Sequence, residues 1–315
     1  MVDLESLAKA FLNRGKGAQA LLQDGCELIN TLKKPLTTVE VMAVLGAVVG
    51  GADFSKCAEK AARYIAVALA NTPNAGAVML DRLKKLIMDF EAQGLHREAF
   101  LLAVSGAKSG ALSLLALTEP RGWAEEVVYV EVLSNYMKGA LDSDFHIDLG
   151  MLALGAVMDA CMAGRTACRY AKAALLPRIA ASLAFERQLD VAEEYLEAAL
   201  EALEQLQQEF NAGELADYLN LLFPLGWDDK SVEAVKSYLV LLAYTSAASV
   251  YRFISSEKMY KYVEEFYRRA VGTQFEALAR VSWARFAYVF RRMPFQDFAR
   301  EVERIYSDLA AKAFM

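Results

Sequence analysis

The sequence predicts an all-α protein. Apolar residues recur with a helical period of about 3.6 residues from end to end, and almost no segment alternates apolar and polar residues between turn residues as a half-buried strand would. The connections between the expected helices are short, so consecutive helices should fold back on one another as antiparallel pairs. Such pairs build either an irregular globular bundle or a superhelix of stacked hairpins.

Prolines and capping residues mark the ends of the expected helices. All six prolines lie at or beside a place where a helix should begin, break or end, since proline lacks the backbone N–H that a helix interior needs. They are Pro35, Pro73, Pro120, Pro177, Pro224 and Pro294. Thr37 before Glu40, and Asp190 before Glu193, each place a capping oxygen three residues ahead of a carboxylate.

These signals divide the chain into a run of helices. The segment 165–187 should be interrupted near Pro177, and the other helices should be continuous. The expected helices are residues 3–13, 17–33, 38–49, 54–71, 76–93, 95–117, 121–141, 146–163, 165–187, 190–210, 213–223, 229–254, 256–271, 274–292 and 295–313.

The apolar character of the chain is expected to serve helix packing and not membrane insertion. Hydrophobic residues make up 56% of the sequence, but the longest apolar stretches, 41–52, 100–118 and 149–158, are bounded by acids or interrupted by Lys108. A membrane-spanning helix needs about 20 uninterrupted apolar residues. The N-terminal residues include acids and lack the apolar run of a signal peptide. The sequence therefore predicts a cytoplasmic protein without membrane association.

Cysteine and histidine usage argues against a metal centre. The four cysteines form no C-x-x-C motif, and the two histidines are His96 and His146, so a zinc site of the usual kind is not expected. No other cofactor is expected. The cysteines are expected to be buried thiols, and an intracellular disulfide would be the alternative in a protein from a hyperthermophile.

Residues 83–106 form the clearest repeated pattern. Bulky residues on a first helix are followed by a turn glycine and by small residues that let the second helix approach closely; they are Leu83, Leu86, Ile87, Phe90, Gly94, Ala99, Ala103 and Gly106. This spacing resembles a tetratricopeptide repeat. Ile87 stands where that family usually has glycine, and the usual closing proline is missing.

Weaker matches to the same pattern occur elsewhere. Residues 176–199 keep the spacing but carry Arg187 at the turn position, residues 61–73 match half a repeat, and an overlapping match at 154–174 competes with the second. Together the matches cover about a third of the chain. The resemblance implies a right-handed TPR-like α-solenoid over residues 1–225, followed by an aromatic-rich, mildly basic helical region over 226–315. The alternative is an irregular globular helical bundle.

The two architectures differ in function. Stacked hairpins would leave a concave groove that binds a peptide or a partner helix, whereas a bundle needs no groove. The resemblance implies that the exposed side of each first helix lines the groove. In the best hairpin these residues are Asp81, Lys84, Met88 and Glu91. The sequence therefore predicts a non-enzymatic interaction or assembly scaffold with a protein or peptide partner.

The C-terminal region offers a second hypothesis. Residues 251–315 hold 12 Lys and Arg against 8 Asp and Glu, together with 15 of the 33 aromatic residues. Cations beside aromatic rings can bind single-stranded nucleic acid. The residues that could form such a surface are Arg268, Arg269, Arg291 and Arg292. The basic end could also pair head-to-tail with the acidic helix 190–210 of a second copy, whose face carries Glu193, Glu197, Glu201 and Glu204.

Catalytic motifs are weak. Ser105 and Lys108 have the S-x-x-K spacing, but its companion motifs are absent. The loop 142–148 places Asp142, Asp144, His146 and Asp148 at alternate positions without the glycine and distal glutamate of a calcium loop. Helix capping is the expected role of this loop, with a weak metal site as the alternative. We therefore expect no enzymatic activity.

Overall fold

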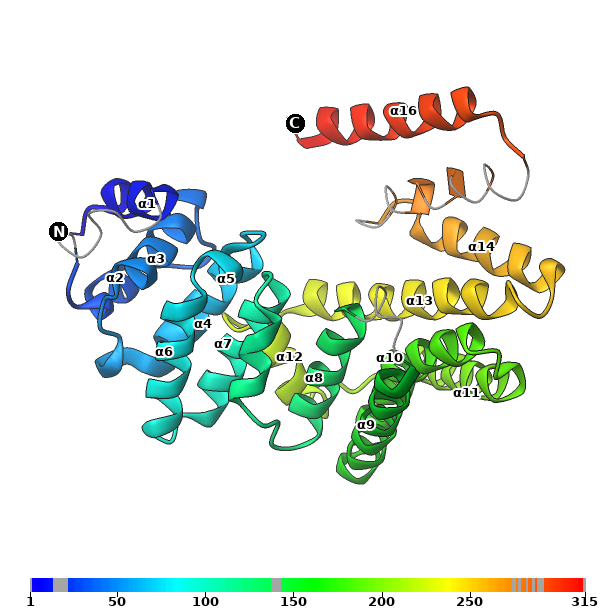
Figure 1. Ribbon diagram of the computed structural model, residues 1–315, viewed down its shortest axis with the longest axis horizontal. Helices are drawn as coiled ribbons and strands as arrows, with labels where there is room; N and C mark the ends of the chain where they lie inside the picture. Colours follow the sequence, from blue (N-terminus) through cyan, green and yellow to red (C-terminus); the bar gives the residue numbers. More distant parts are fainter. Residues whose placement is uncertain are drawn as a thin grey trace. The chain divides into compact units, whose positions relative to one another are not determined.

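The computed structural model is helical over the residues that it describes, which confirms the all-α prediction. The described residues are 2–13, 22–136, 143–273, 276, 279–281, 283–284, 287 and 292–313; at 136, 143–147, 306 and 308–313 only the backbone is described. Figure 1 shows the elements in chain order. They are α1 (Leu4–Leu12), α2 (Gly25–Thr31), α3 (Thr38–Gly50), the 3-10 helix η2 (Ser55–Cys57), α4 (Ala58–Ala70), α5 (Ala75–Val78), α6 (Leu80–Ala92), α7 (His96–Lys108), η3 (Leu112–Leu117), α8 (Trp123–Tyr136), α9 (Ser143–Ala163), α10 (Arg165–Phe185), α11 (Leu189–Gln208), α12 (Ala216–Leu222), α13 (Asp229–Tyr251), α14 (Ser256–Ala270) and α16 (Phe295–Ala313).

The chain forms two compact units that interleave in sequence. The first unit comprises Met1–Cys168 and Asn211–Val232, and the second comprises Arg169–Phe210 and Glu233–Met315. The chain therefore leaves the first unit within α10, returns to it around α12 and leaves it again within α13. These units do not follow the expected division at residues 1–225 and 226–315, which rested on composition and on a linear repeat.

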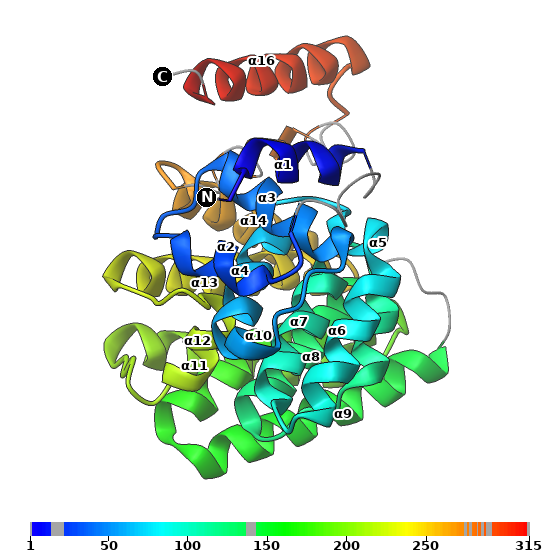
Figure 2. The same cartoon turned by 90° about the vertical axis from the view of Figure 1, so that its left-hand side faces the viewer.

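In the first unit, helices pack closely where glycine removes the side chain. α1 lies across α3 (Figure 2), and a Cβ at Gly46 would lie 2.0 Å from the carbonyl oxygen of Leu7. A Cβ at Gly76 on α5 would lie 2.3 Å from the carbonyl oxygen of Gly106 on α7. Both distances are far below a carbon–oxygen contact, so only glycine allows these backbones to meet.

The predicted hairpin at residues 83–106 is present as α6 and α7. Leu83, Ile87 and Phe90 are buried on α6, and Ala99 and Ala103 are buried on α7, as the spacing indicated. The turn between the helices is a Schellman motif, in which the Leu95 N–H donates to the Phe90 carbonyl at 2.9 Å. Gly94 occupies the left-handed region of this turn with φ 77°.

Two pairs of consecutive helices lie side by side. α3 packs on α4 and α6 packs on α7; α4 also contacts α7, and α3 contacts α6. The first helices of the two pairs, α3 and α6, therefore contact each other, and so do the second helices, α4 and α7. One apolar core joins these four helices, with Val44, Ile65 and Leu102 fully buried in it.

In the second unit, the hairpin at 176–199 has the same turn although glycine is missing. The Gln188 N–H donates to the Leu183 carbonyl at 2.9 Å, and Arg187 takes the left-handed conformation with φ 66°. The Arg187 guanidinium lies 4.7 Å from the centre of the Phe253 ring. This cation–π contact offsets part of the cost, roughly 1–2 kcal/mol, of a side chain in that conformation.

Several expected helix ends were wrong. The capping box at Thr37 and Glu40 is confirmed, but α11 begins after Gln188 without a side-chain cap, so Asp190 does not cap it. α10 runs through Pro177 without the expected interruption. The Arg178 side chain, next to the proline, donates to the Ala174 carbonyl and to the Tyr238 hydroxyl.

Both pairs of cysteines form disulfides, so the expectation of buried thiols was wrong. Cys26 on α2 bonds to Cys57 in η2, and Cys161 on α9 bonds to Cys168 on α10. In each disulfide the two cysteines come from different helices and are too far apart in the sequence to form a C-x-x-C motif. Among the described residues, no helix combines the length and the apolar character needed to cross a membrane.

Replacing Gly94 with alanine should lower the free energy of unfolding by about 1 kcal/mol, because an L side chain in the left-handed region costs roughly 1–2 kcal/mol. No atom lies within 4 Å of the position that the new Cβ would take, so the loss would reflect backbone conformation and not a clash. Gly150→Ala, in the helix α9 and equally free of neighbours, should instead stabilise by about 0.5–1 kcal/mol. Urea unfolding of both variants would contradict this explanation if they shifted in the same direction.

Thr118→Val should stabilise the protein by about 1 kcal/mol. The Thr118 hydroxyl is buried and has no hydrogen-bond partner among the described residues, so its removal relieves an uncompensated desolvation penalty. Ser109→Ala is the matched control, because the buried Ser109 hydroxyl donates to the Thr72 carbonyl at 2.8 Å and accepts from the Gly76 N–H at 3.1 Å. That variant should be destabilised by about 1–3 kcal/mol in the same thermal unfolding measurement.

Candidate functional site

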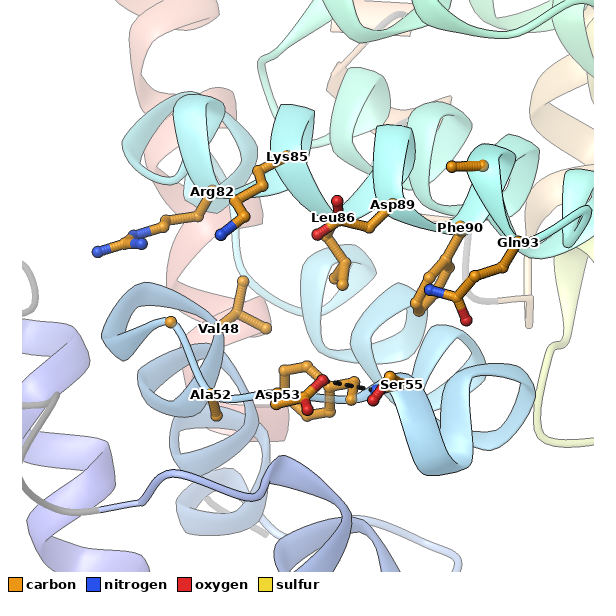
Figure 3. A pocket seen from close by; sticks show the side chains of 13 residues that line it. Val48, Ala52, Asp53, Ser55, Arg82, Lys85, Leu86, Asp89, Phe90 and Gln93 are labelled. Carbon is orange, nitrogen blue, oxygen red and sulfur yellow. Dashed lines mark hydrogen bonds between the residues drawn. The ribbon is translucent and has the colours of Figure 1, made fainter.

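A cavity of about 420 Å³ lies in the first unit between α6 and the C-terminal end of α3 (Figure 3). Arg82, Lys85, Leu86, Asp89 and Gln93 project from α6 on one side, and Val48, Ala52, Asp53 and Ser55 lie opposite them. This volume is within the range of natural ligand pockets. The cavity therefore lies between the first helices of two adjacent hairpins.

The lower side of the cavity is built from a firmly held backbone turn. α3 ends in a Schellman motif in which the Ala52 N–H donates to the Ala47 carbonyl at 3.0 Å and Gly51 adopts φ 78°. A Cβ on Gly51 would lie 3.0 Å from the Arg82 guanidinium, so the small residue leaves room for that side chain.

The segment after Gly51 is tied to α2 at three points. The Gly25 N–H donates to the Asp53 carbonyl at 2.7 Å, the Asp53 N–H donates to the Gln23 carbonyl at 2.8 Å, and the Cys26–Cys57 disulfide follows a few residues later. A surface held in this way changes little when a ligand binds, which lowers the entropic cost of binding.

The cavity combines an apolar centre with charges of both signs. Phe54 and Phe90 are buried beneath it, and Leu86 is half-buried. The Ser55 N–H donates to the Asp53 carboxylate at 2.9 Å, and this bond and the Ser55 hydroxyl hold the pKa of Asp53 below its usual value. Asp53 therefore carries a negative charge at neutral pH.

Two cations on α6 face this cavity without an ion-pair partner. Neither Arg82 nor Lys85 makes a salt bridge among the residues that the structure describes, and the same holds for Asp89 one turn further along the helix. In Figure 3, Arg82 and Lys85 lie toward one end of the cavity and Gln93 and Ser55 toward the other. The arrangement suits a ligand that has an acidic group beside an apolar group.

The residues expected to bind a partner lie on another face of α6. Asp81, Lys84, Met88 and Glu91 do not line the cavity. Met88 is exposed, and Glu91 pairs with His96 on α7. The expected residues and the cavity-lining residues lie on the same helix, but those that face the cavity are offset from the expected ones by about one residue. Whether the expected face binds a partner stays a prediction.

Two of the four C-terminal arginines expected to bind nucleic acid pair with an acid. Arg268 and Arg269 both pair with Glu265, at 2.7 and 3.2 Å, and Arg269 also lies over the Tyr244 ring. Arg292 is exposed with φ 53°, and Arg291 lies outside the described residues.

The aromatic rings of the same unit pack mainly on one another. Tyr251 and Tyr262 are stacked 5.2 Å apart, and Tyr251 is buried. Its pKa rises to about 12 because of burial and the nearby Glu193 carboxylate, which itself pairs with Lys258 at 2.8 Å. Rings that form a core are not available for stacking on bases. The nucleic-acid surface at Arg268, Arg269, Arg291 and Arg292 therefore stays a prediction.

The other sequence motifs do not assemble into a site. Ser105 is buried on α7, and neither it nor Lys108 lines the cavity. Asp142 and the side chains of Asp144 and His146 lie outside the described residues, and Asp148 is exposed on α9. Among the described residues, no three His, Cys, Asp or Glu side chains gather as metal ligands would.

One pair of carboxyl groups has perturbed acidity. Burial, together with a hydrogen bond to Asp159 and the negative charge of that residue, raises the pKa of Glu126 to about 6. Glu126 lies on α8 and Asp159 on α9. Neither residue lines the cavity, so the pair does not form an acid/base site there.

Comparison with protein-family models, with curated proteins and with solved structures gives no match to this chain.

The Glu126–Asp159 pair should make the stability of the protein depend on pH. Because the folded state binds the Glu126 proton more tightly than the unfolded state, the free energy of unfolding should fall as pH rises from about 4.5 through about 6. Glu126→Gln should remove this slope and raise stability at pH 7 by about 1–2 kcal/mol, after allowance for partial exposure.

Urea unfolding between pH 4 and pH 7 would measure the slope. Asp228→Asn is the control, because hydrogen bonds from the Ser231 N–H and hydroxyl lower the pKa of Asp228 and move its titration below this window. A slope that persists in Glu126→Gln would show that another group titrates.

Proposed function

We propose that this protein is a non-enzymatic interaction module that binds a peptide segment or a helix of a partner protein in the cavity between α3 and α6. The observation that supports this proposal most strongly is the pair of unpartnered cations, Arg82 and Lys85, beside an apolar centre on a rigid backbone. Unpaired charges at a concave apolar surface favour a ligand that completes them.

The packing of the hairpins is consistent with a TPR-like arrangement. The cavity lies between two first helices, which is where the resemblance to tetratricopeptide repeats implies a concave binding face. The described lining contains Ser55. It contains no histidine or cysteine, and no described hydrogen bond joins Lys85 to Ser55 in a way that would activate this serine as a nucleophile. A binding role therefore accounts for the residues better than catalysis does.

The paired arginines favour a protein partner over nucleic acid. Arg268 and Arg269 already have carboxylate partners, and the chain as a whole carries a formal net charge of −6. An acidic protein repels a polyanion unless a strong local patch opposes this field.

A cytoplasmic location stays a prediction. Disulfides persist mainly in oxidising compartments, and intracellular proteins of hyperthermophiles are the known exception. The two disulfides of this chain fit either of these settings better than a reducing mesophilic cytosol.

Leu86→Glu should abolish selection of peptides from a random displayed library, because it places a carboxylate in the apolar centre of the cavity, where it can also pair with Arg82 and Lys85 in place of the ligand. Met88→Glu makes the same chemical change two residues away, on the exposed face of α6 outside the cavity, and should leave the enriched peptides unchanged. Thermal unfolding of both variants would establish that they are folded.

The opposite outcome would also be informative. Loss of enrichment in Met88→Glu but not in Leu86→Glu would move the binding face to the expected residues Asp81, Lys84, Met88 and Glu91 and would reject the cavity. No enrichment by the wild-type protein would reject the peptide-binding proposal itself.

A further inference from the structure

α9 of the first unit exposes larger apolar side chains than it buries. Its buried face is formed by Leu149, Val157 and three alanines, Ala153, Ala156 and Ala160. On the opposite side the relative exposures are 67% for Met151, 50% for Leu152, 68% for Met158 and 80% for Met162. A helix with large apolar side chains on its exposed side is normally covered there, and none of the residues that the structure describes covers this face.

The exposed residues form one line along the helix. Met151, Gly155, Met158 and Met162 are separated by four, three and four positions, which places them on the same face. We call these four residues the α9 stripe. Nothing lies within 4 Å of the position that a Cβ on Gly155 would take, so the stripe has an open notch between Met151 and Met158. Flexible methionines around a notch can adapt to the apolar side chains of another helix.

The charged side chains described on α9 itself are both negative. Asp148 is exposed three residues before Met151, on the same face, and forms no ion pair among the described residues. Asp159 follows Met158 and lies beside Glu126 of α8, where burial, a hydrogen bond to Asp159 and repulsion by its negative charge raise the pKa of Glu126 to about 6. A cation placed at this edge would relieve that repulsion.

This charge pattern discriminates between the classes of partner that could cover the stripe. Anionic lipid surfaces and nucleic acids are disfavoured because they would meet Asp148 and the Glu126–Asp159 pair. A second copy of α9 would bring acids of the same sign to the interface. A helix with an apolar face and flanking basic residues matches both the apolar line and its acidic edge.

We propose that the α9 stripe docks an amphipathic helix of a partner protein whose apolar face is flanked by Lys or Arg. The docked helix places one apolar side chain in the notch at Gly155 and directs its cations toward Asp148 and toward Asp159 with Glu126. This surface is separate from the cavity between α3 and α6, so the two proposals can fail independently.

Fluorescence anisotropy with two labelled peptides tests the proposal. Both are amphipathic helices of about 18 residues with a leucine face, a length at which helix formation on binding is favourable. One carries flanking lysines and the other flanking glutamates. The full-length protein should bind the lysine peptide at least about tenfold more tightly, a difference of about 1.4 kcal/mol.

Variants separate the apolar and the electrostatic contributions. Met158→Ser with Met162→Ser should weaken binding of the lysine peptide about tenfold or more, and Asp148→Asn should weaken it several-fold with a smaller dependence on salt. Met88→Ser with Val78→Ser removes exposed apolar side chains of the same unit outside the α9 stripe and should change nothing. Because the substituted methionines are exposed, the variants should keep the unfolding temperature of the wild-type protein.

Three results would overturn the proposal. The first is equal affinity for the two peptides or no binding of either. The second is unchanged binding by the α9 variants. The third is a dimer in analytical ultracentrifugation that the Met158→Ser, Met162→Ser variant converts to monomers, because a second copy would then cover the stripe.

Discussion

The closest packing in the first unit depends on backbones meeting where no side chain stands between them. At Gly46 and at Gly76 a single methyl group would overlap a main-chain carbonyl of the opposing segment, Leu7 in one case and Gly106 in the other. Such overlap cannot be relieved by a change of rotamer, because the obstructing atoms belong to the backbone. These glycines fix how closely α1 approaches α3 and α5 approaches α7. The position of α3, and hence one wall of the cavity, follows from them.

Turn geometry explains why the sequence predicted the hairpins well and their ends poorly. The Schellman motif after α6 has Gly94 in the left-handed position, and its glycine was visible in the sequence. The same motif after α10 has Arg187 in that position, held by a contact with Phe253 that is more than 60 residues away in the chain. Local sequence cannot reveal a compensation that depends on tertiary structure.

The cavity was missed for a different reason. A helical period shows which residues are buried, and Leu83, Ile87 and Phe90 were identified correctly. It does not show which of the remaining faces meets a neighbouring hairpin, because that depends on how α3 ends. Gly51 stops α3 and turns the chain toward Asp53, which brings this turn opposite Arg82, Lys85 and Asp89. The signal available in the sequence was the i, i+3 pair of cations, Arg82 and Lys85, with Asp89 on the same face of the helix, and the repeat register favoured the neighbouring face instead.

The two surfaces of the first unit differ in the chemistry that they offer to a partner. The cavity between α3 and α6 presents cations toward one end, so under the proposed function it would favour a ligand with an acidic group. The α9 stripe is exposed and consists mainly of flexible methionines, and the charged side chains described on the same helix are carboxylates. A single short ligand cannot satisfy the charges of both surfaces. The acidic group that the cations of the cavity attract is repelled by the carboxylates beside the α9 stripe. An assembly that uses both surfaces must therefore bring either two partners or one partner with segments of opposite charge. In the second case linkage would raise the affinity of each contact through effective concentration, which is how a scaffold with two modest surfaces reaches tight binding.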